Sequence, residues 1–177
     1  ADRDVALLGE HRDEIQAQLS LPEQRVIADA QHKPRSAFLW WQAGLRKDKP
    51  KTLHTAEDCL EAGRRFGFPF WMRAQRGAGA QGSCKANDIE EAVLWSTFWN
   101  RTRPGNPIFA QEYLPGRNFA FHSVWHEGQL LCSGVRERLE FVYPQHAISG
   151  VTSSPVVART VHDALVNERA TASIKVL

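Results

Sequence analysis

The chain has 177 residues, of which 42% are hydrophobic and 24% are charged, and its formal net charge is +2. This is the composition of an ordinary folded domain, and so small a charge gives no general argument for binding nucleic acid or a membrane surface. Cys59, Cys84 and Cys132 form no CxxC pair and no zinc-ligand spacing, which favours reduced thiols in the cytoplasm over a disulfide scaffold. No apolar run approaches the ~20 residues that a bilayer-spanning helix needs.

Helices are expected in the first third of the chain. In residues 5–20, apolar residues among charges indicate a strand end followed by a helix. Ser20 to Glu23 indicate a helix start, with Ser20 as its cap and Pro22 in its first turn. A further helix is predicted from about Pro34 to Ala43, with Gly44 as its C-terminal stop.

Two capping-box patterns predict the next helices. Thr55-Ala56-Glu57-Asp58 starts a helix that ends at Gly67, and Asn87-Asp88-Ile89-Glu90 starts another. The apolar residues of this second helix predict its inner face, which consists of Ile89, Val93, Leu94 and Phe98. Between the two helices, the apolar run from Phe68 to Arg73 predicts a buried strand.

The C-terminal half is predicted to consist mostly of strands. Ile108 to Tyr113 forms one strand, and Phe119 to Trp125 pairs with Leu130 to Val135 in a hairpin around Glu127-Gly128. Arg138 to Val142 is a further candidate strand, and Ser154-Pro155 is expected to start a final helix. The order of elements predicts an α+β fold with antiparallel sheets and flanking helices in two subdomains.

Arg73 is followed by a loop that contains Arg76 together with Gly77, Gly79 and Gly82. Glycine lets backbone amides approach a ligand closely, and arginine carries a permanent charge suited to phosphate. The loop leads into strand-like residues 83–86 instead of a helix, and it lacks the Gly-Lys-Ser/Thr ending of a P-loop. One interpretation is a flap that folds over the phosphates of ATP, and the other is a mobile hairpin loop.

Four sequence blocks, in order from about Ile27 to Ser154, resemble an ATP-grasp domain of the carbamoyl-phosphate synthase large-subunit type and its amino-acid ligase relatives. The first block is Ala30-Gln31-His32-Lys33 with Gln42-Ala43-Gly44-Leu45 and Pro50-Lys51-Thr52. The second is Gly67-Phe68-Pro69-Phe70-Trp71-Met72-Arg73 with Gly77-Ala78-Gly79-Ala80-Gln81-Gly82. The third is Gln111-Glu112-Tyr113-Leu114-Pro115-Gly116, and the fourth is Arg136-Glu137-Arg138-Leu139-Glu140 with Ser149-Gly150-Val151-Thr152.

The resemblance implies an ATP site between two subdomains, with a glycine flap over the triphosphate and a linker whose backbone holds adenine. The residues that it assigns to ATP are Lys33, Arg73, Arg76, Gly77, Gly79, Gly82, Glu112, Tyr113, Leu114 and Asn118. It further implies that Arg136 and Arg138 hold a substrate carboxylate or its acyl-phosphate, so these two are the candidate catalytic residues. The alternative for them is a solvated, charged strand face shared with Glu137.

The chain departs from the family pattern in two places. Asn118 stands where the family usually has an acidic residue that binds the ribose hydroxyls, and Gly79-Ala80 stands where Gly-Gly is common. The family's ligands for Mg²⁺ lie on a later strand, so we expect them outside these residues and assign no metal ligand here. We expect a piece of a longer enzyme that is incomplete at both ends and inactive alone. Its expected parts are the end of a preceding domain with the helices that follow it (1–48), a small lid subdomain (49–113) and the start of the large subdomain (114–177).

The resemblance thus implies the ATP-binding part of a ligase that activates a small carboxylate as an acyl-phosphate. The alternative is a non-catalytic nucleotide-binding regulatory module on the same fold, which the Asn118 departure favours. A third interpretation is a nucleic-acid-binding domain that uses Arg64, Arg65, Arg73, Arg76 and Lys85, and the near-neutral charge argues against it. No nucleic-acid or membrane partner is expected, and a homo-oligomer is left open.

Overall fold

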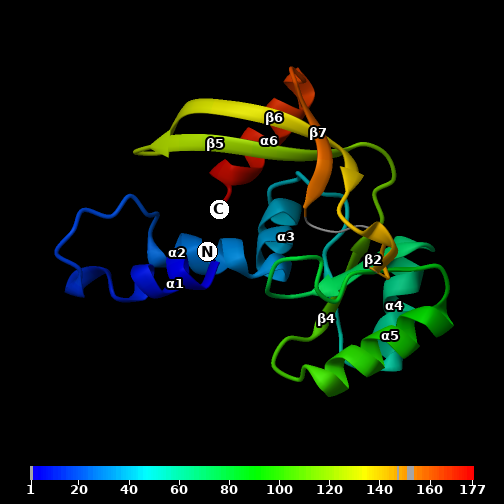
Figure 1. Ribbon diagram of the computed structural model, residues 1–177. Coiled ribbons are helices and arrows are strands. Elements are labelled where there is room, and N and C mark those ends of the chain that lie inside the picture. The colour runs from blue at the N-terminus through cyan, green and yellow to red at the C-terminus, as the bar shows by residue number, and fades with distance from the viewer. Residues whose placement is uncertain (1, 147, 151–153) are drawn as a thin grey trace.

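The computed structural model of the chain describes residues 2–146, 148–150 and 154–177, and it contains two antiparallel sheets with helices around them (Figure 1). The first sheet has four strands in the order β1-β4-β2-β3, and the second has three in the order β5-β6-β7. Their bounds are β1 Lys51–Leu53, β2 Phe70–Ala74, β3 Cys84–Ala86, β4 Ile108–Glu112, β5 Asn118–His126, β6 Gln129–Phe141 and β7 Pro155–Val161. The expected α+β class with antiparallel sheets is confirmed.

The hydrophobic core lies between the four-stranded sheet and helices α4 (Ala56–Phe66) and α5 (Ile89–Thr102). Along β2 every second residue is buried, and Phe70 and Met72 are fully enclosed. Leu53 and Ile108, from β1 and β4, complete the centre of this core. Full burial of a large apolar side chain is worth roughly 1.5–3 kcal/mol, so this cluster fixes the sheet on which the site is built.

Both predicted capping patterns lie at helix starts. The Thr55 side chain accepts a hydrogen bond from the Asp58 amide at 3.2 Å, and the Asp58 carboxylate accepts one from the Thr55 amide at 2.9 Å, which completes a capping box for α4. Asp88 caps α5 by accepting a hydrogen bond from the Glu91 amide at 2.9 Å. Such caps satisfy amides that have no partner inside the helix.

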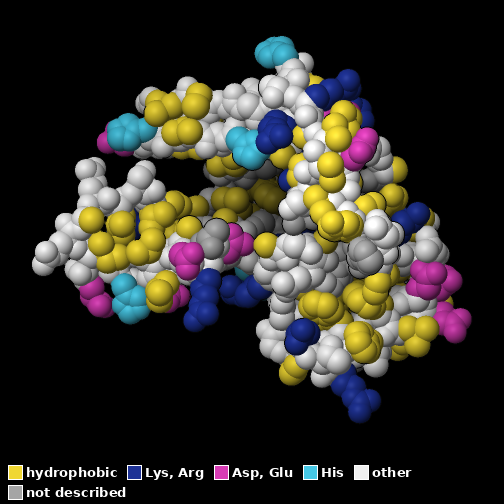
Figure 2. Space-filling model, viewed as in Figure 1, with side chains coloured by type: hydrophobic (Ala, Val, Ile, Leu, Met, Phe, Trp, Pro, Cys, Tyr) yellow, Lys and Arg dark blue, Asp and Glu magenta, His cyan; other side chains and the backbone are white. Residues whose placement is uncertain are grey.

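The predicted inner face of α5 is wrong in part. Leu94 and Phe98 are 63% and 59% exposed, and hydrophobic side chains are visible on the surface over this part of the molecule (Figure 2). Ala92 and Ser96 are buried in their place. The two tryptophans of the helix, Trp95 and Trp99, pack against the core, so the helix is rotated to bury its largest aromatic side chains.

The N-terminal region is helical. Its elements are α1 (Asp2–Glu10), a short 3-10 turn η1 (Arg12–Glu14), α2 (Gln24–Gln31) and α3 (Lys33–Gln42). The expected strand end in residues 5–20 is therefore wrong, and so is Ser20 as a cap, because α2 begins after Glu23 with no side-chain cap. The helix predicted from Pro34 is confirmed as α3, whose first turn is capped by the ring of His32.

The second sheet begins with the predicted hairpin, in which β5 and β6 meet around Glu127-Gly128. The separate strand expected at 138–142 is the continuation of β6, which runs unbroken to Phe141. The helix expected at Ser154-Pro155 is wrong, because Pro155 starts β7, a strand at the edge of the sheet. An edge position tolerates a proline, since the missing amide has no partner to lose there.

The final helix, α6 (Ala164–Lys175), starts only after β7 and is capped by Asp163. It is joined to α3 by a hydrogen bond of 2.8 Å from the Trp40 indole to the carbonyl of Ser173. None of the described helices combines the length and apolar composition that a membrane-spanning segment needs.

Candidate functional site

A cavity of about 480 Å³ lies where the four-stranded sheet meets the start of the three-stranded sheet. The glycine loop between β2 and β3 covers one part of it, and the linker between β4 and β5 forms another. Its lining residues are Lys33, Trp71, Arg73, Gly77, Ala78, Gly79, Ala80, Gln81, Ser83, Gln111, Glu112, Tyr113, Leu114, Gly116, Asn118, Arg138 and Phe141.

Strand β2 contributes two side chains to this cavity because of its alternation. Trp71 and Arg73 are partly exposed, whereas the alternate residues of the strand are buried in the core. Gln111 is the cross-strand partner of Trp71 on β4, so it reaches the same side of the sheet. Trp71 stacks on Tyr113 with ring centroids 6.2 Å apart, and the Nζ of Lys85 lies 5.0 Å from the Tyr113 ring. The linker end of the cavity therefore has an aromatic wall.

Cationic side chains gather at the opposite end, near the glycine loop. The Nε of Arg73 is buried and makes no hydrogen bond to any described residue. Burial, and next the charge of Arg46, lower the pKa of Arg73. Burial, and next the charge of Arg73, likewise lower the pKa of Lys33. These cations repel each other in a partly dehydrated place, which is unfavourable unless an anion binds there.

Arg46, in the segment after α3, adds to this charge, although it does not line the cavity itself. It donates a hydrogen bond of 3.3 Å to the side chain of Gln111, while its Nε is buried and makes no hydrogen bond to a described residue. Burial lowers the pKa of Arg46, and the carboxylate of Glu112 partly opposes that effect. A perturbed cluster of this kind, set in a cavity, is a candidate functional site.

The glycine loop is held in place at both ends. Gly77 has φ of +95°, and the Nζ of Lys33 donates a hydrogen bond to its carbonyl oxygen. At the other end Gly82 has φ of +65°, and a Cβ there would lie 3.0 Å from the Ala74 amide nitrogen. The indole of Trp95 also donates a hydrogen bond of 3.0 Å to the carbonyl of Gly82. Glycine is needed at both positions, by backbone conformation at the first and also by close packing at the second.

Three consecutive residues of the loop that line the cavity have backbone amides without a hydrogen-bond partner among the described residues. The amides of Gly77, Ala78 and Gly79 make no hydrogen bond to any described residue. Backbone amides beside unpaired cations are suited to the oxygens of a polyphosphate. The chemistry of this end of the cavity therefore fits a phosphorylated ligand.

Nine of the twelve residues that the sequence assigns to the site line this one cavity, and Arg76, Gly82 and Arg136 do not. The backbone of Arg76 exchanges two hydrogen bonds with the side chain of Asn106, which fixes the start of the loop. Gly82 packs against β2 and β4. Of the fourth sequence block, Val151 and Thr152 lie outside the described residues.

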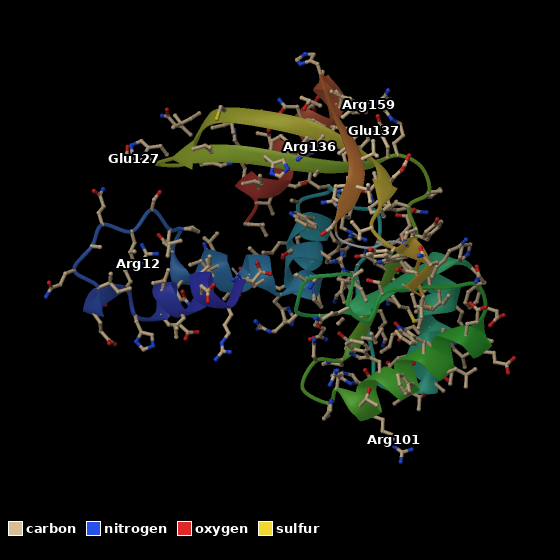
Figure 3. The ribbon with its side chains drawn as sticks, viewed as in Figure 1. Arg12, Arg101, Glu127, Arg136, Glu137 and Arg159 are labelled. Carbon is tan, nitrogen blue, oxygen red and sulfur yellow. The ribbon has the colours of Figure 1, made fainter. Side chains whose placement is uncertain are left out.

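The three charged residues at 136–138 divide between the two faces of the second sheet. Glu137 is 5% exposed and is bound by Arg117 and Arg159 on one face, and Figure 3 shows Glu137 beside Arg159. Arg136 and Arg138 share the other face, where they line a smaller cavity of about 130 Å³ with His122. The side-chain Nε of Arg138 is buried and unpaired among the described residues. The three residues therefore do not form one face of paired charges.

Sequence reasoning missed Trp71, Gln111 and Arg46. The first two follow from strand alternation. Trp71 lies two residues before Arg73, so it faces the same side of β2, and Gln111 is the cross-strand partner of Trp71 on β4. Arg46 had no local signal, because its place beside the cavity depends on contact with Gln111, which lies 65 residues away in the chain. The described residues contain no group of three or more His, Cys, Asp or Glu side chains arranged to hold a metal ion.

No protein-family model matches the chain. It is 31% identical over 96 residues to the carbamoyl phosphate synthase large chain of Clostridium perfringens, a match that covers 54% of this chain and 9% of the relative. It is 28% identical over 99 residues to the same protein of Thermoanaerobacter pseudethanolicus, which covers 56% of this chain and again 9% of the relative. The match therefore spans less than a tenth of the length of these curated relatives.

Solved structures resemble nearly the whole chain. Carboxyaminoimidazole ribonucleotide synthase of Aspergillus clavatus, complexed with ATP, has a TM-score of 0.66 at 15% identity and covers 98% of this chain and 44% of its own. The biotin carboxylase domain of 2-oxoglutarate carboxylase from Hydrogenobacter thermophilus, in complex with MgADP, ADP and bicarbonate, has a TM-score of 0.69 at 14% identity, with 99% and 39% covered. D-alanine–D-alanine ligase of Bacillus anthracis has a TM-score of 0.59 at 16% identity, with 87% and 51% covered. At these identities the likeness is one of fold.

Proposed function

Because this chain has the ATP-grasp fold that these solved enzymes share, we propose that it is the ATP-binding part of an ATP-dependent ligase. The ligase activates a carboxylate as an acyl-phosphate, in the manner of carbamoyl phosphate synthase. The observation that carries the proposal is the buried Nε of Arg73, which has no hydrogen-bond partner among the described residues and whose side chain shares one cavity with Lys33 and the unbonded amides of the glycine loop. An anion with several oxygens matches that set of donors.

In this proposal the two ends of the cavity bind different parts of ATP. Lys33 and Arg73 contact the phosphates, and the loop from Gly77 to Gly82 closes over them and excludes water. The backbone of Glu112 and Leu114 binds the edge of adenine, with the Trp71–Tyr113 wall at that end of the cavity. Binding of the phosphates neutralises cations that repel each other in the ligand-free protein, which adds to affinity.

Arg136 and Arg138 are proposed to hold the carboxylate of the second substrate. One of its oxygens attacks the γ-phosphorus of ATP, the bond from that phosphorus to the bridging oxygen of ADP breaks, and an acyl-phosphate and ADP result. Arg138 supports this role because it lines both the nucleotide cavity and the smaller cavity with Arg136 and His122. Arg138, placed between ATP and the substrate carboxylate, stabilises the negative charge that is transferred with the phosphoryl group.

Magnesium has no assigned place among the described residues, which contain no cluster able to hold it. We propose that its ligands lie outside the described residues. The proposed division into residues 1–48, 49–113 and 114–177 agrees with the positions of the two sheets, since the first lies within 51–112 and the second within 118–161.

A regulatory nucleotide-binding module remains the second candidate function, because Asn118 lines the cavity at the place proposed for the ribose. An amide binds hydroxyls more weakly than a carboxylate does. A module of this kind binds ATP but releases no phosphate when it is offered carboxylates, bicarbonate and amines. If the chain is part of a ligase, the intact protein releases phosphate with one of them, so the comparison is made on the intact protein.

The proposal is tested by isothermal titration calorimetry of ATP with magnesium against the chain and its Arg73→Ala variant. We expect binding by the unchanged chain and a loss of about tenfold or more in the variant, since a hydrogen bond to a charged group is worth about 1.5–3 kcal/mol. Arg101→Ala is the matched control, because Arg101 is exposed on α5 far from the cavity (Figure 3). Equal affinity of the Arg73 and Arg101 variants would reject the proposed site.

A further inference from the structure

The residue that joins the linker to β5, Arg117, belongs to a cluster of ion pairs with Glu137 and Arg159, which we call the ionic clamp. Arg117 lies between Gly116 and Asn118, both of which line the nucleotide cavity, but it does not line the cavity itself. Its guanidinium binds the carboxylate of Glu137 on β6 at two points, with Nε to Oε1 at 2.6 Å and Nη2 to Oε2 at 3.0 Å. A two-point contact of this kind fixes orientation as well as distance.

A second arginine completes the clamp from the next strand. The Nε of Arg159, on β7, donates to Oε2 of Glu137 at 2.8 Å. The backbone register aligns Phe119, Glu137 and Arg159 across the three strands, and the Arg117 guanidinium lies 4.8 Å from the Phe119 ring centroid. One buried carboxylate thus ties the exit of the linker to all three strands of the second sheet.

The clamp and the cavity lie on opposite sides of β5. Asn118 is the cross-strand partner of Arg138, and both line the cavity, whereas the neighbouring pair Phe119 and Glu137 belongs to the other face. When Arg117 is fixed on that face, strand alternation directs Asn118 toward the cavity. The nearby Asp163, which caps α6, lies 3.8 Å from Arg117 and adds a contact to the helix.

We propose that Arg117, Glu137 and Arg159 are positioning residues for the nucleoside end of the ligand. They hold Asn118 and the linker backbone in the binding geometry before the nucleotide arrives, which lowers the ordering cost of binding. The phosphate end does not depend on the clamp, because Lys33, Arg73 and the glycine loop belong to α3 and the first sheet. The inference rests on the proposed nucleotide site, and it concerns only one half of it.

This separation of the two ends provides the test. Calorimetry at fixed ionic strength compares ATP with inorganic tripolyphosphate, which carries the phosphate charges without the nucleoside. In Glu137→Gln we expect ATP to bind about tenfold more weakly, because the linker must be ordered on binding, while the affinity for tripolyphosphate stays unchanged. The matched control is Glu140→Gln, which removes an exposed carboxylate from the same strand.

A second variant keeps the test valid if Glu137→Gln is poorly folded. Arg117→Lys retains the charge but loses the two-point geometry, and we expect it to weaken ATP in the same selective way. Equal weakening of ATP and tripolyphosphate would show a merely structural role and would overturn the inference, as would unchanged ATP affinity in a folded variant. If the unchanged chain binds neither ligand, the proposed function itself fails, which is a distinct result.

Discussion

Lys33 donates a hydrogen bond from its Nζ to the backbone carbonyl of Gly77, which ties the first residue of α3 to the glycine loop. The two residues lie 44 positions apart in the chain, and both line the cavity at the end proposed for the phosphates. Beside it, the Lys33 amide donates to the carbonyl of Gln75 at 3.0 Å. The helix thus holds the loop through a backbone contact and a side-chain contact. Only the Lys33 side chain is able to leave its carbonyl partner and bind a ligand instead.

Replacing Lys33 with methionine removes the side-chain contact and keeps the backbone one. We expect faster amide hydrogen exchange at Ala74 and Ser83, whose amides donate to the carbonyls of Gln81 and Ala80 in the loop. We also expect nucleotide affinity to fall by roughly tenfold through the loss of one charge-assisted contact. Hydrogen exchange read by mass spectrometry and calorimetry measure the two effects. Lys47→Met, at an exposed position after α3, is the control, and equal exchange in both variants would contradict the tether.

Replacing Arg73 with methionine should have opposite effects on stability and on binding. In the ligand-free protein Arg73 is partly buried, its Nε has no hydrogen-bond partner among the described residues, and its charge is repelled by Arg46, so an apolar side chain should raise the free energy of unfolding by about 1 kcal/mol. Urea denaturation without nucleotide measures the gain, and calorimetry measures the loss of ATP affinity. A less stable variant would mean that Arg73 has a structural partner, and the argument for an anion site would weaken.

Trp71 should report directly on the nucleoside end of the cavity. Stacking of a base on an aromatic side chain is worth about 1–3 kcal/mol, so Trp71→Leu should weaken ATP by about tenfold and leave tripolyphosphate unaffected. The change in tryptophan fluorescence on adding ATP should be largely lost in this variant. Trp41→Phe, on α3 away from the cavity lining, should keep that change, and loss of the signal there instead would contradict the assignment.

Acid stability should depend on Asp58. A hydrogen bond from Lys51, together with the amides of His54 and Thr55, lowers the pKa of Asp58 well below its ordinary value. Because the folded-state pKa is depressed, the stabilisation is complete above the ordinary carboxyl pKa of about 4 and is lost as pH falls toward the folded-state pKa. Asp58→Asn should therefore cost about 1 kcal/mol at pH 7, a loss of capping and pairing strength.

That cost should shrink as the pH is lowered from 5 to about 2, because Asp58 becomes protonated in the unfolded chain while it stays ionised in the folded protein, so the ionised side chain stabilises the fold less. Urea denaturation across this range measures the difference between the two proteins. Glu57→Gln, at an exposed position in the same helical turn, should show little difference at any pH. A cost for Asp58→Asn that does not change with pH would exclude the ionised pair as its cause.

Elements with a local cause could be predicted from the sequence. The Thr55–Asp58 capping box and the Glu127-Gly128 turn each involve only residues that are a few positions apart in the chain. Their geometry follows from local hydrogen bonds and from the backbone freedom of glycine. The predictions failed where distant contacts decided the outcome. Residues 155–161 form a strand because β6 offers them an edge, and α5 is rotated because the core accepts its tryptophans.

The sequence by itself determined that a strand delivers Arg73 to a glycine loop, because alternation along a strand and glycine's backbone freedom are local properties. The tertiary structure decided which groups surround that loop. Lys33 and Arg46 come from the helical region before the sheet, and Arg138 comes from the second sheet. Strand pairing and packing between distant segments bring these residues together. Whether a cation such as Arg73 has an anionic partner depends on that packing, so the sequence of its own segment could not show it.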